Sequence, residues 1–77
     1  CITFDLIDGS NCYLGGAISP GLGMRAKAMH EQTARLPLVD LKVKPTELIG
    51  NNTITCMQIG VWYGIELELR GQKTSYL

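Results

Sequence analysis

Small residues placed before two helical patterns are the parts of this 77-residue chain whose types and spacing could support chemistry. Gly15 and Gly16 lie within an apolar run, and Ser19-Pro20-Gly21 leads directly into the first helical pattern. The first amides of a helix and its dipole favour an anion, so this turn could hold a phosphate. A helix start with Ser19 near the N-cap and Pro20 in the first turn would explain the same residues without a ligand.

A second motif of small residues, Gly50-Asn51-Asn52-Thr53, precedes the second helical pattern. The side chain of either Asn52 or Thr53 could accept the first free backbone amides of that helix. Neither motif completes a G-x-G-x-x-G or G-x-x-x-x-G-K-[ST] phosphate-binding pattern. The spacing therefore leaves both motifs open to a structural or a ligand-binding role.

The reactive side chains form no catalytic constellation. His30 is the single histidine and has no Ser or Cys partner nearby, so we expect it to face solvent or to cap a helix. Cys1, Cys12 and Cys56 contain no C-x-x-C pair and are too scattered for a structural zinc site. We interpret them as buried free thiols of a reducing cytosol. The sequence thus predicts no catalytic residue and no metal ligand in this chain.

An antiparallel hairpin over residues 1–19 is predicted to carry the first motif. Residues 2–6 alternate apolar and polar side chains, Asp8-Gly9 is a strong turn signal, and residues 12–18 provide the return strand. A glycine pair inside a strand indicates a bulge or the close approach of another backbone or a ligand.

Two helices and an extended segment are predicted to follow the hairpin. Apolar residues at steps of three and four predict a helix over about residues 20–36, which Pro37 ends. Residues 38–46 are predicted to be extended. A second helix is predicted over about residues 53–70, with Gly71 as its C-terminal cap.

One face of the second predicted helix carries Gly60 and Gly64. Each glycine costs about 1 kcal/mol of helix stability relative to alanine, which indicates that another element packs closely there. A small dimerisation module that uses this face is one function class that these residues leave open.

Composition and charge are those of an ordinary globular piece. Hydrophobic residues make up 45% and charged residues 18%, and seven basic residues balance seven acidic ones. A net charge of zero argues against direct nucleic-acid binding, although the basic residues gather between positions 25 and 44, as on a solvated helix face. No apolar run reaches the roughly 18 residues of a membrane span. We therefore expect a cytoplasmic protein without a membrane partner.

Four stretches, in order, resemble successive motifs of the type III pantothenate kinases, a group also described as the Bvg accessory factor (Baf) family of transcriptional activators. They are ITFDLID at residues 2–8, YLGGAISPG at 13–21, TARLP at 33–37 and GNNT at 50–53. The second and third stretches are the most specific of the four.

This resemblance implies an α/β fold, in which the hairpin and two helices form an α+β fragment of an actin-like, ribonuclease-H-like ATPase domain. It implies a homodimer that transfers the ATP γ-phosphate to pantothenate, the first step of coenzyme A biosynthesis. A divalent metal (Mg) and a monovalent cation (K or NH4) would assist the reaction. A non-catalytic transcriptional regulator of the same family is the alternative function.

Few site residues carry over from the resemblance. Thr53 matches the family's pantothenate-contacting threonine, reached across the dimer, and a helix N-cap is its structural alternative. Gly15, Gly16 and Gly21 match positions where backbone approaches the nucleotide. The family's Asp-x-Gly-Thr, Asp-x-Gly-Asn-Thr and Gly-Ala-Asp-Arg motifs do not occur in these 77 residues. We therefore expect a fragment of the carboxy-terminal half, without the upstream nucleotide- and substrate-binding parts and inactive on its own.

Overall fold

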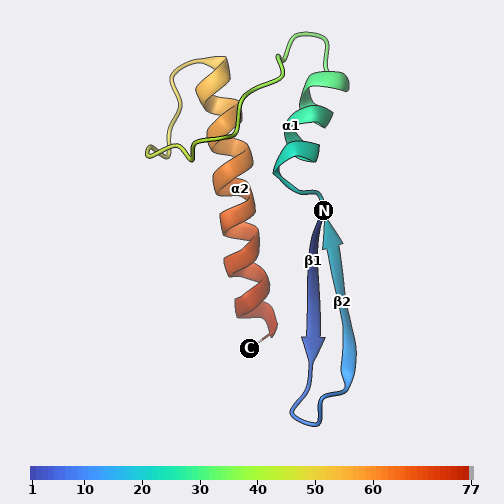
Figure 1. The fold of residues 1–77 in the computed structure, drawn as a ribbon. Helices are drawn as coiled ribbons and strands as arrows, with labels where there is room; N and C mark the ends of the chain where they lie inside the picture. Colours follow the sequence, from blue (N-terminus) through green and yellow to red (C-terminus); the bar gives the residue numbers. More distant parts are fainter. Residues whose placement is uncertain (77) are drawn as a thin grey trace.

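The computed structural model describes residues 1–76 and contains a two-stranded antiparallel sheet followed by two helices. Strands β1 (Ile2–Ile7) and β2 (Tyr13–Ser19) form the hairpin, and helices α1 (Leu22–Glu31) and α2 (Thr53–Tyr76) follow. The hairpin extends away from α1, and α1 packs beside α2 (Figure 1). The predicted combination of one hairpin and two helices is confirmed, and it makes the chain an α+β fold.

The turn of the hairpin is closed by the side chain of Asp8. Its Oδ1 accepts the backbone N–H groups of Ser10 and Cys12, each at 2.9 Å. Asn11 takes the left-handed conformation, with φ at 61°, which asparagine tolerates better than most residues. These local bonds set where β1 ends and β2 begins.

The glycine pair of β2 marks a β-bulge. Leu6 pairs with Gly15 whereas Ile7 pairs with Tyr13, so Leu14 is the extra residue on β2. Gly15 has a φ of +115°, a conformation that residues with a side chain rarely adopt. The bulge that the sequence indicates is therefore present.

Gly16 allows the closest backbone approach in the hairpin. A Cβ atom at this position would lie 1.6 Å from the carbonyl oxygen of Phe4. No side chain fits there, and the group that approaches Gly16 is the neighbouring strand.

Helix α1 begins later than predicted, and Ser19 is not its N-cap. Ser19 is the last residue of β2, where it pairs with Ile2, and Gly21 is the N-cap without a side-chain bond. Strand pairing that continues to Ser19 leaves only Pro20 and Gly21 for the turn.

The C-terminal end of α1 also differs from the prediction of a helix up to residue 36. The last helical residue is Glu31, after which the Thr33 hydroxyl donates to the carbonyl oxygen of Met29. Nδ1 of His30 lies 2.8 Å from the carbonyl oxygen of Leu36 and is exposed. Because these contacts fold the chain back on the helix end, α1 stops before Pro37 can terminate it.

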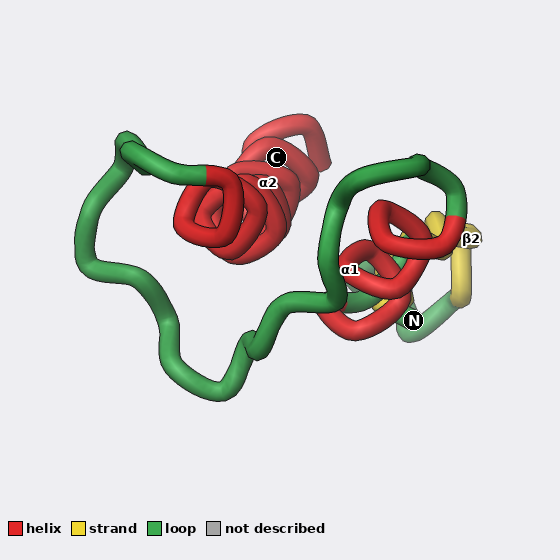
Figure 2. The backbone as a smooth tube through the Cα atoms, turned by 90° about the horizontal axis from the view of Figure 1, so that it is seen from above, coloured by secondary structure: helices red, strands yellow, loops and turns green. Residues whose placement is uncertain are grey.

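Residues 32–52 form a loop that leads from α1 around to the start of α2 (Figure 2). The segment predicted to be extended, residues 38–46, contains no strand. Three side chains of α2 instead donate hydrogen bonds to its carbonyl groups: Gln58 to Asp40 at 2.9 Å, Trp62 to Leu41 at 3.2 Å and Tyr63 to Pro45 at 3.2 Å. This loop is therefore fixed by the helix and not by a sheet.

Helix α2 continues past Gly71 to Tyr76, so the predicted cap at Gly71 is wrong. Gln72 and Lys73 are good helix formers and no proline follows them, so the helix can continue past this glycine. Gly60 has open space where a side chain would stand, and Gly64 faces only Nη1 of Arg25, at 3.8 Å from its would-be Cβ. Within residues 1–76, therefore, no element packs against this face closely enough to require glycine.

The core is small and lies between α1, the loop and α2. Its buried apolar residues are Ala26, Val39, Met57, Ile59, Val61 and Ile65. Other large apolar side chains remain exposed, such as Ile18 on β2 (78%) and Ile49 in the loop (84%). Cys1, Cys12 and Cys56 are also exposed, so the interpretation of buried thiols is wrong. Cys1 and Cys12 directly precede β1 and β2, and Cys56 lies in the first turn of α2.

In the part of the chain that the structure describes, neither helix combines the length and the apolar character needed to cross a membrane.

Candidate functional site

The GNNT motif forms the N-terminal cap of α2. Oδ1 of Asn52 accepts the backbone N–H of Thr55 at 2.9 Å, and the N–H of Asn52 donates to Oγ1 of Thr55 at 3.3 Å. The N–H of Asn51 donates to the same hydroxyl oxygen at 3.3 Å. Two side chains thus satisfy the amides of this turn reciprocally, as in a capping box. Asn52 is the N-cap.

Gly50 has a steric role in the same cap. A Cβ atom at this position would lie 2.6 Å from the backbone nitrogen of Cys56 and 2.9 Å from its Cα. Because those neighbours are backbone atoms of a helix, they cannot move aside independently. The chain can therefore enter α2 along this path only with glycine at position 50.

Thr53 is the first residue of α2, and its side chain is exposed. Among the hydrogen bonds of residues 1–76, none involves the Thr53 hydroxyl, because Asn52 and Thr55 make the cap. Of the two roles left open for Thr53, the N-cap role is thus filled by its neighbour. The hydroxyl is available to a ligand or partner.

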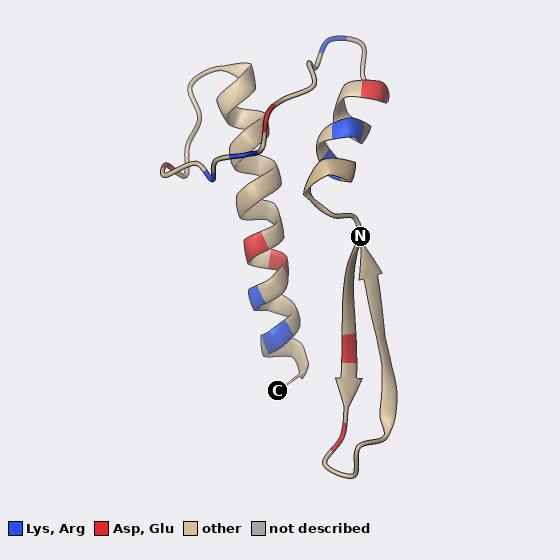
Figure 3. Cartoon of the chain, in the orientation of Figure 1, with Lys and Arg blue, Asp and Glu red and all other residues tan. Residues whose placement is uncertain are grey.

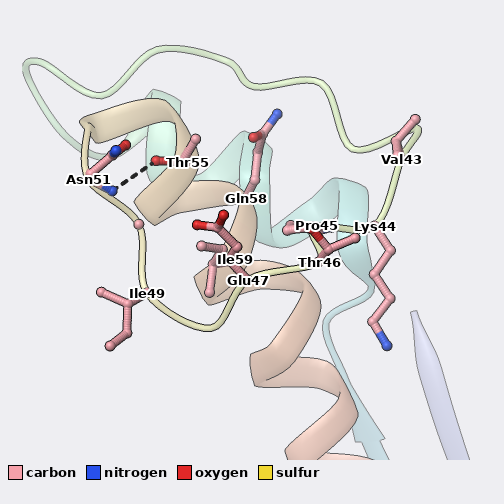
Figure 4. A pocket seen from close by; sticks show the side chains of 11 residues that line it. Val43, Lys44, Pro45, Thr46, Glu47, Ile49, Asn51, Thr55, Gln58 and Ile59 are labelled. Carbon is pink, nitrogen blue, oxygen red and sulfur yellow. Dashed lines mark hydrogen bonds between the residues drawn. The ribbon is translucent and has the colours of Figure 1, made fainter.

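A cavity of about 540 Å³ lies between the loop and the first turns of α2 (Figure 4). It is lined by Val43, Lys44, Pro45, Thr46, Glu47, Ile49, Gly50, Asn51, Thr55, Gln58 and Ile59. Apolar surface and several polar groups converge there, which suits a small molecule with both kinds of group. Thr53 lies between two lining residues in the chain, Asn51 and Thr55, at the same helix end.

The three glycines matched to the nucleotide side lie in a different part of the fold. Gly15 and Gly16 belong to the bulge of β2, and Gly21 joins β2 to α1. A Cβ atom on Gly21 would lie 3.5 Å from the backbone nitrogen of Cys1, so this glycine packs against the start of β1. None of the three lines the cavity at the start of α2, and Thr53 does not line it either. The structure therefore separates the two groups of predicted site residues.

The basic residues between positions 25 and 44 are partly paired and are not simply a solvated face. Lys44 lies 3.3 Å from Glu66 and over the ring of Tyr63, and Arg25 forms an ion pair with Glu68. Figure 3 shows the acidic residues about halfway along α2, with the basic residues of this helix nearer its C-terminal end. Two of the five basic residues thus bind the acidic positions of α2, whereas Lys27, Arg35 and Lys42 are exposed, as expected of a solvated face.

The Arg25–Glu68 pair was not identified from the sequence. The two residues lie 43 positions apart and belong to different helices, so no local spacing relates them. The sequence feature that could have indicated the pair is the uneven distribution of charge, with basic residues between positions 25 and 44 and glutamates at 66 and 68.

Residues 1–76 contain no group of three or more His, Cys, Asp or Glu side chains that could hold a metal ion. The acidic side chains of the hairpin, Asp5 and Asp8, do not converge with those of α2 in such a group.

Comparisons with known proteins identify the family. The family model of type III pantothenate kinases matches residues 1–74. The chain is 53% identical over 76 residues to the type III pantothenate kinase of Christiangramia forsetii, covering 99% of the chain and 31% of that protein. It is 48% identical over 69 residues to the type III pantothenate kinase of Moorella thermoacetica, covering 90% of the chain and 27% of that protein. The chain thus spans less than a third of the length of these curated relatives, and it belongs to the type III pantothenate kinase family.

Proposed function

We propose that this chain is part of an ATP-dependent pantothenate kinase and that the Thr53 hydroxyl contacts pantothenate. The observation that supports this role is that the cap at the start of α2 does not use the Thr53 hydroxyl. Asn52 and Thr55 satisfy the helix amides, and the exposed Thr53 keeps its hydroxyl for another molecule. Family membership supports the reaction, since the relatives that match nearly the whole of this chain bear the name of that kinase.

In this proposal the chain supplies one side of the acceptor site and one side of the nucleotide site. Pantothenate meets the first turn of α2, and the contact is made across a homodimer. ATP approaches the Ser19–Gly21 turn, where the first amides of α1 suit a phosphate. Gly15 and Gly16 shape the hairpin that leads to this turn.

Phosphoryl transfer depends mainly on positioning and on stabilising charge. Mg and a monovalent cation (K or NH4) would supply much of that stabilisation in the assembled enzyme. The described residues do not fit a metal site, because no group of three ligand side chains converges. The proposal therefore assigns no cation ligand and no catalytic base to residues 1–76.

The test replaces Thr53 in the full-length protein that contains this chain. Thr53→Val keeps the shape of the side chain and removes the hydroxyl. Loss of one hydrogen bond of about 1.4 kcal/mol would raise the KM for pantothenate roughly tenfold. Thr53→Ser should retain the wild-type KM, and steady-state kinetics with both substrates measures the change.

Thr74→Val is the matched control, because Thr74 is exposed on the same helix and donates to the carbonyl oxygen of Arg70 within that helix. It should leave both KM values unchanged. A wild-type KM for pantothenate in Thr53→Val would remove Thr53 from the site. A full-length protein that does not phosphorylate pantothenate would favour the Baf-type regulator instead.

A further inference from the structure

Arg25 joins three parts of the fold through one side chain. It lies in the first turns of α1, and its Nε donates to the carbonyl oxygen of Pro20 at 2.8 Å. Its guanidinium also donates to Oε2 of Glu68 on α2. The hydroxyl of Ser19, at the end of β2, donates to the same carboxylate oxygen at 3.2 Å. The strand end, the turn and α2 are thus connected by one network.

This pair differs from the other ion pairs of residues 1–76. The side chains of Arg25 and Glu68 are 24% and 26% exposed. In the pair between Arg70 and Glu66, the arginine is 75% exposed and both residues lie on α2. An ion pair screened from water keeps more of its strength than one at the surface. Among the described residues, Arg25–Glu68 is also the pair that fastens α1 to α2.

Outside this network, no side-chain hydrogen bond of residues 1–76 holds the Ser19–Gly21 turn. Pro20 has no N–H to donate, and the N-cap Gly21 makes no side-chain bond to α1. The guanidinium lies beside Gly64 of α2, where a Cβ would be in ordinary van der Waals contact with Nη1 of Arg25, at 3.8 Å.

We infer that Arg25, with Glu68 and Ser19, is a positioning device that sets the Ser19–Gly21 turn against α2. The inference rests on the proposed function, in which that turn faces ATP and α2 begins with the pantothenate-contacting Thr53. The ion pair then fixes the nucleotide side of the site relative to the acceptor side. Arg25 and Glu68 themselves touch neither substrate.

The inference has a kinetic consequence because in-line transfer requires the two substrates to be aligned. A misplacement of about 1 Å can lower the rate of an enzyme roughly a hundredfold. Breaking the pair should therefore lower kcat and raise the KM for ATP. The KM for pantothenate should change little, since the cap that presents Thr53 does not involve Arg25.

The experiment compares Arg25→Gln and Glu68→Gln with Arg70→Gln in the full-length protein. The first two variants should lower kcat/KM for ATP by about tenfold to a hundredfold. Arg70→Gln removes an arginine that pairs with Glu66 on α2, the helix that also carries Glu68, and should change kcat/KM by less than roughly twofold. The double variant Arg25→Gln, Glu68→Gln should lose much less than the sum of the two single losses, because the two residues share the bond between them.

A role in stability alone would give a different result. It would lower the Tm of Arg25→Gln while kcat and both KM values, measured well below that Tm, stayed at wild-type values, and this outcome would overturn the inference. Arg25→Lys, which keeps the charge, should recover part of kcat. If Arg25→Gln does not fold, Glu68→Gln carries the same test, since its amide oxygen can still accept from Ser19.

Hydrogen–deuterium exchange separates this inference from the proposed function. Arg25→Gln should speed exchange of the amides of residues 18–24, and Arg70→Gln should not. Unchanged exchange in this turn would refute the positioning role even in an active kinase. Faster exchange in a full-length protein that lacks kinase activity would support the network and reject the reaction.

Discussion

The first turn of α2 and the middle of α2 are stabilised by different kinds of contact. At the first turn, Gly50, Asn52 and Thr55 interact within one short stretch of chain. Halfway along the helix, Glu66 and Glu68 bind side chains that come from the loop and from α1. One end is therefore organised by its own sequence, and the other is organised by the rest of the fold.

This difference separates what a short peptide can show from what needs the whole protein. Helix caps act through neighbouring residues and persist in isolated helices, whereas long-range ion pairs exist only when both elements are packed. A peptide of residues 48–76 should therefore retain the properties of the first turn. It should not retain any effect of Arg25 or Lys44.

Gly50→Ala is expected to have the largest effect on the first turn. The new Cβ would collide with the backbone of Cys56, so the entry path must shift at a cost of about 2 kcal/mol. Circular dichroism of the 48–76 peptide should show lower helix content. Gly60→Ala is the control, because Gly60 has open space. It should stabilise the helix by about 1 kcal/mol and thereby raise the helix content. Equal helix content in both peptides would contradict the close approach.

Asn52→Ala should have an intermediate effect. It removes the acceptor of the Thr55 amide and should destabilise the helix by about 1 kcal/mol. Asn52→Asp keeps an acceptor oxygen and should stay near wild type. The same ranking is expected for the peptide by circular dichroism and for the full-length protein by thermal unfolding. A loss confined to the full-length protein would show that the cap is not local.

Lys44→Gln should have the smallest effect. Lys44 is 45% exposed in its pair with Glu66, so the pair is worth about 0.5 kcal/mol, and salt should screen it. The Tm of full-length Lys44→Gln should fall slightly in low salt and match wild type in high salt. Lys42→Gln, at a neighbouring lysine of the same loop, is the control. A loss that is independent of salt would point to the contact with Tyr63 instead.

The same division explains what could be predicted from the sequence. The hairpin turn at Asp8, the bulge at the glycine pair and the capping potential of Asn52 follow from neighbouring residues, and all three are present. The role of Thr53 could not be chosen between the helix cap and ligand binding, because the choice depends on which neighbouring side chains make the cap bonds.

The end of α1 and the contacts between distant residues could not be predicted. Helix α1 ends at Glu31 because the following stretch folds back, although apolar periodicity continues to Leu36. Exposure of Cys56 depends on which face of α2 meets the core. The Arg25–Glu68 pair joins two helices whose relative placement no local pattern specifies.

Helix α2 also has a mechanical consequence. Thr53 and Glu68 belong to one uninterrupted helix, and a rise of 1.5 Å per residue separates them by roughly 22 Å. Such a rod acts as a lever: a tilt of about 5° with its pivot at Glu68 would swing the Thr53 end by roughly 2 Å. The three bonds from α2 to the loop lie between these two ends and hold the helix against such a tilt, so the Thr53 end keeps its place when the Arg25 contact is lost.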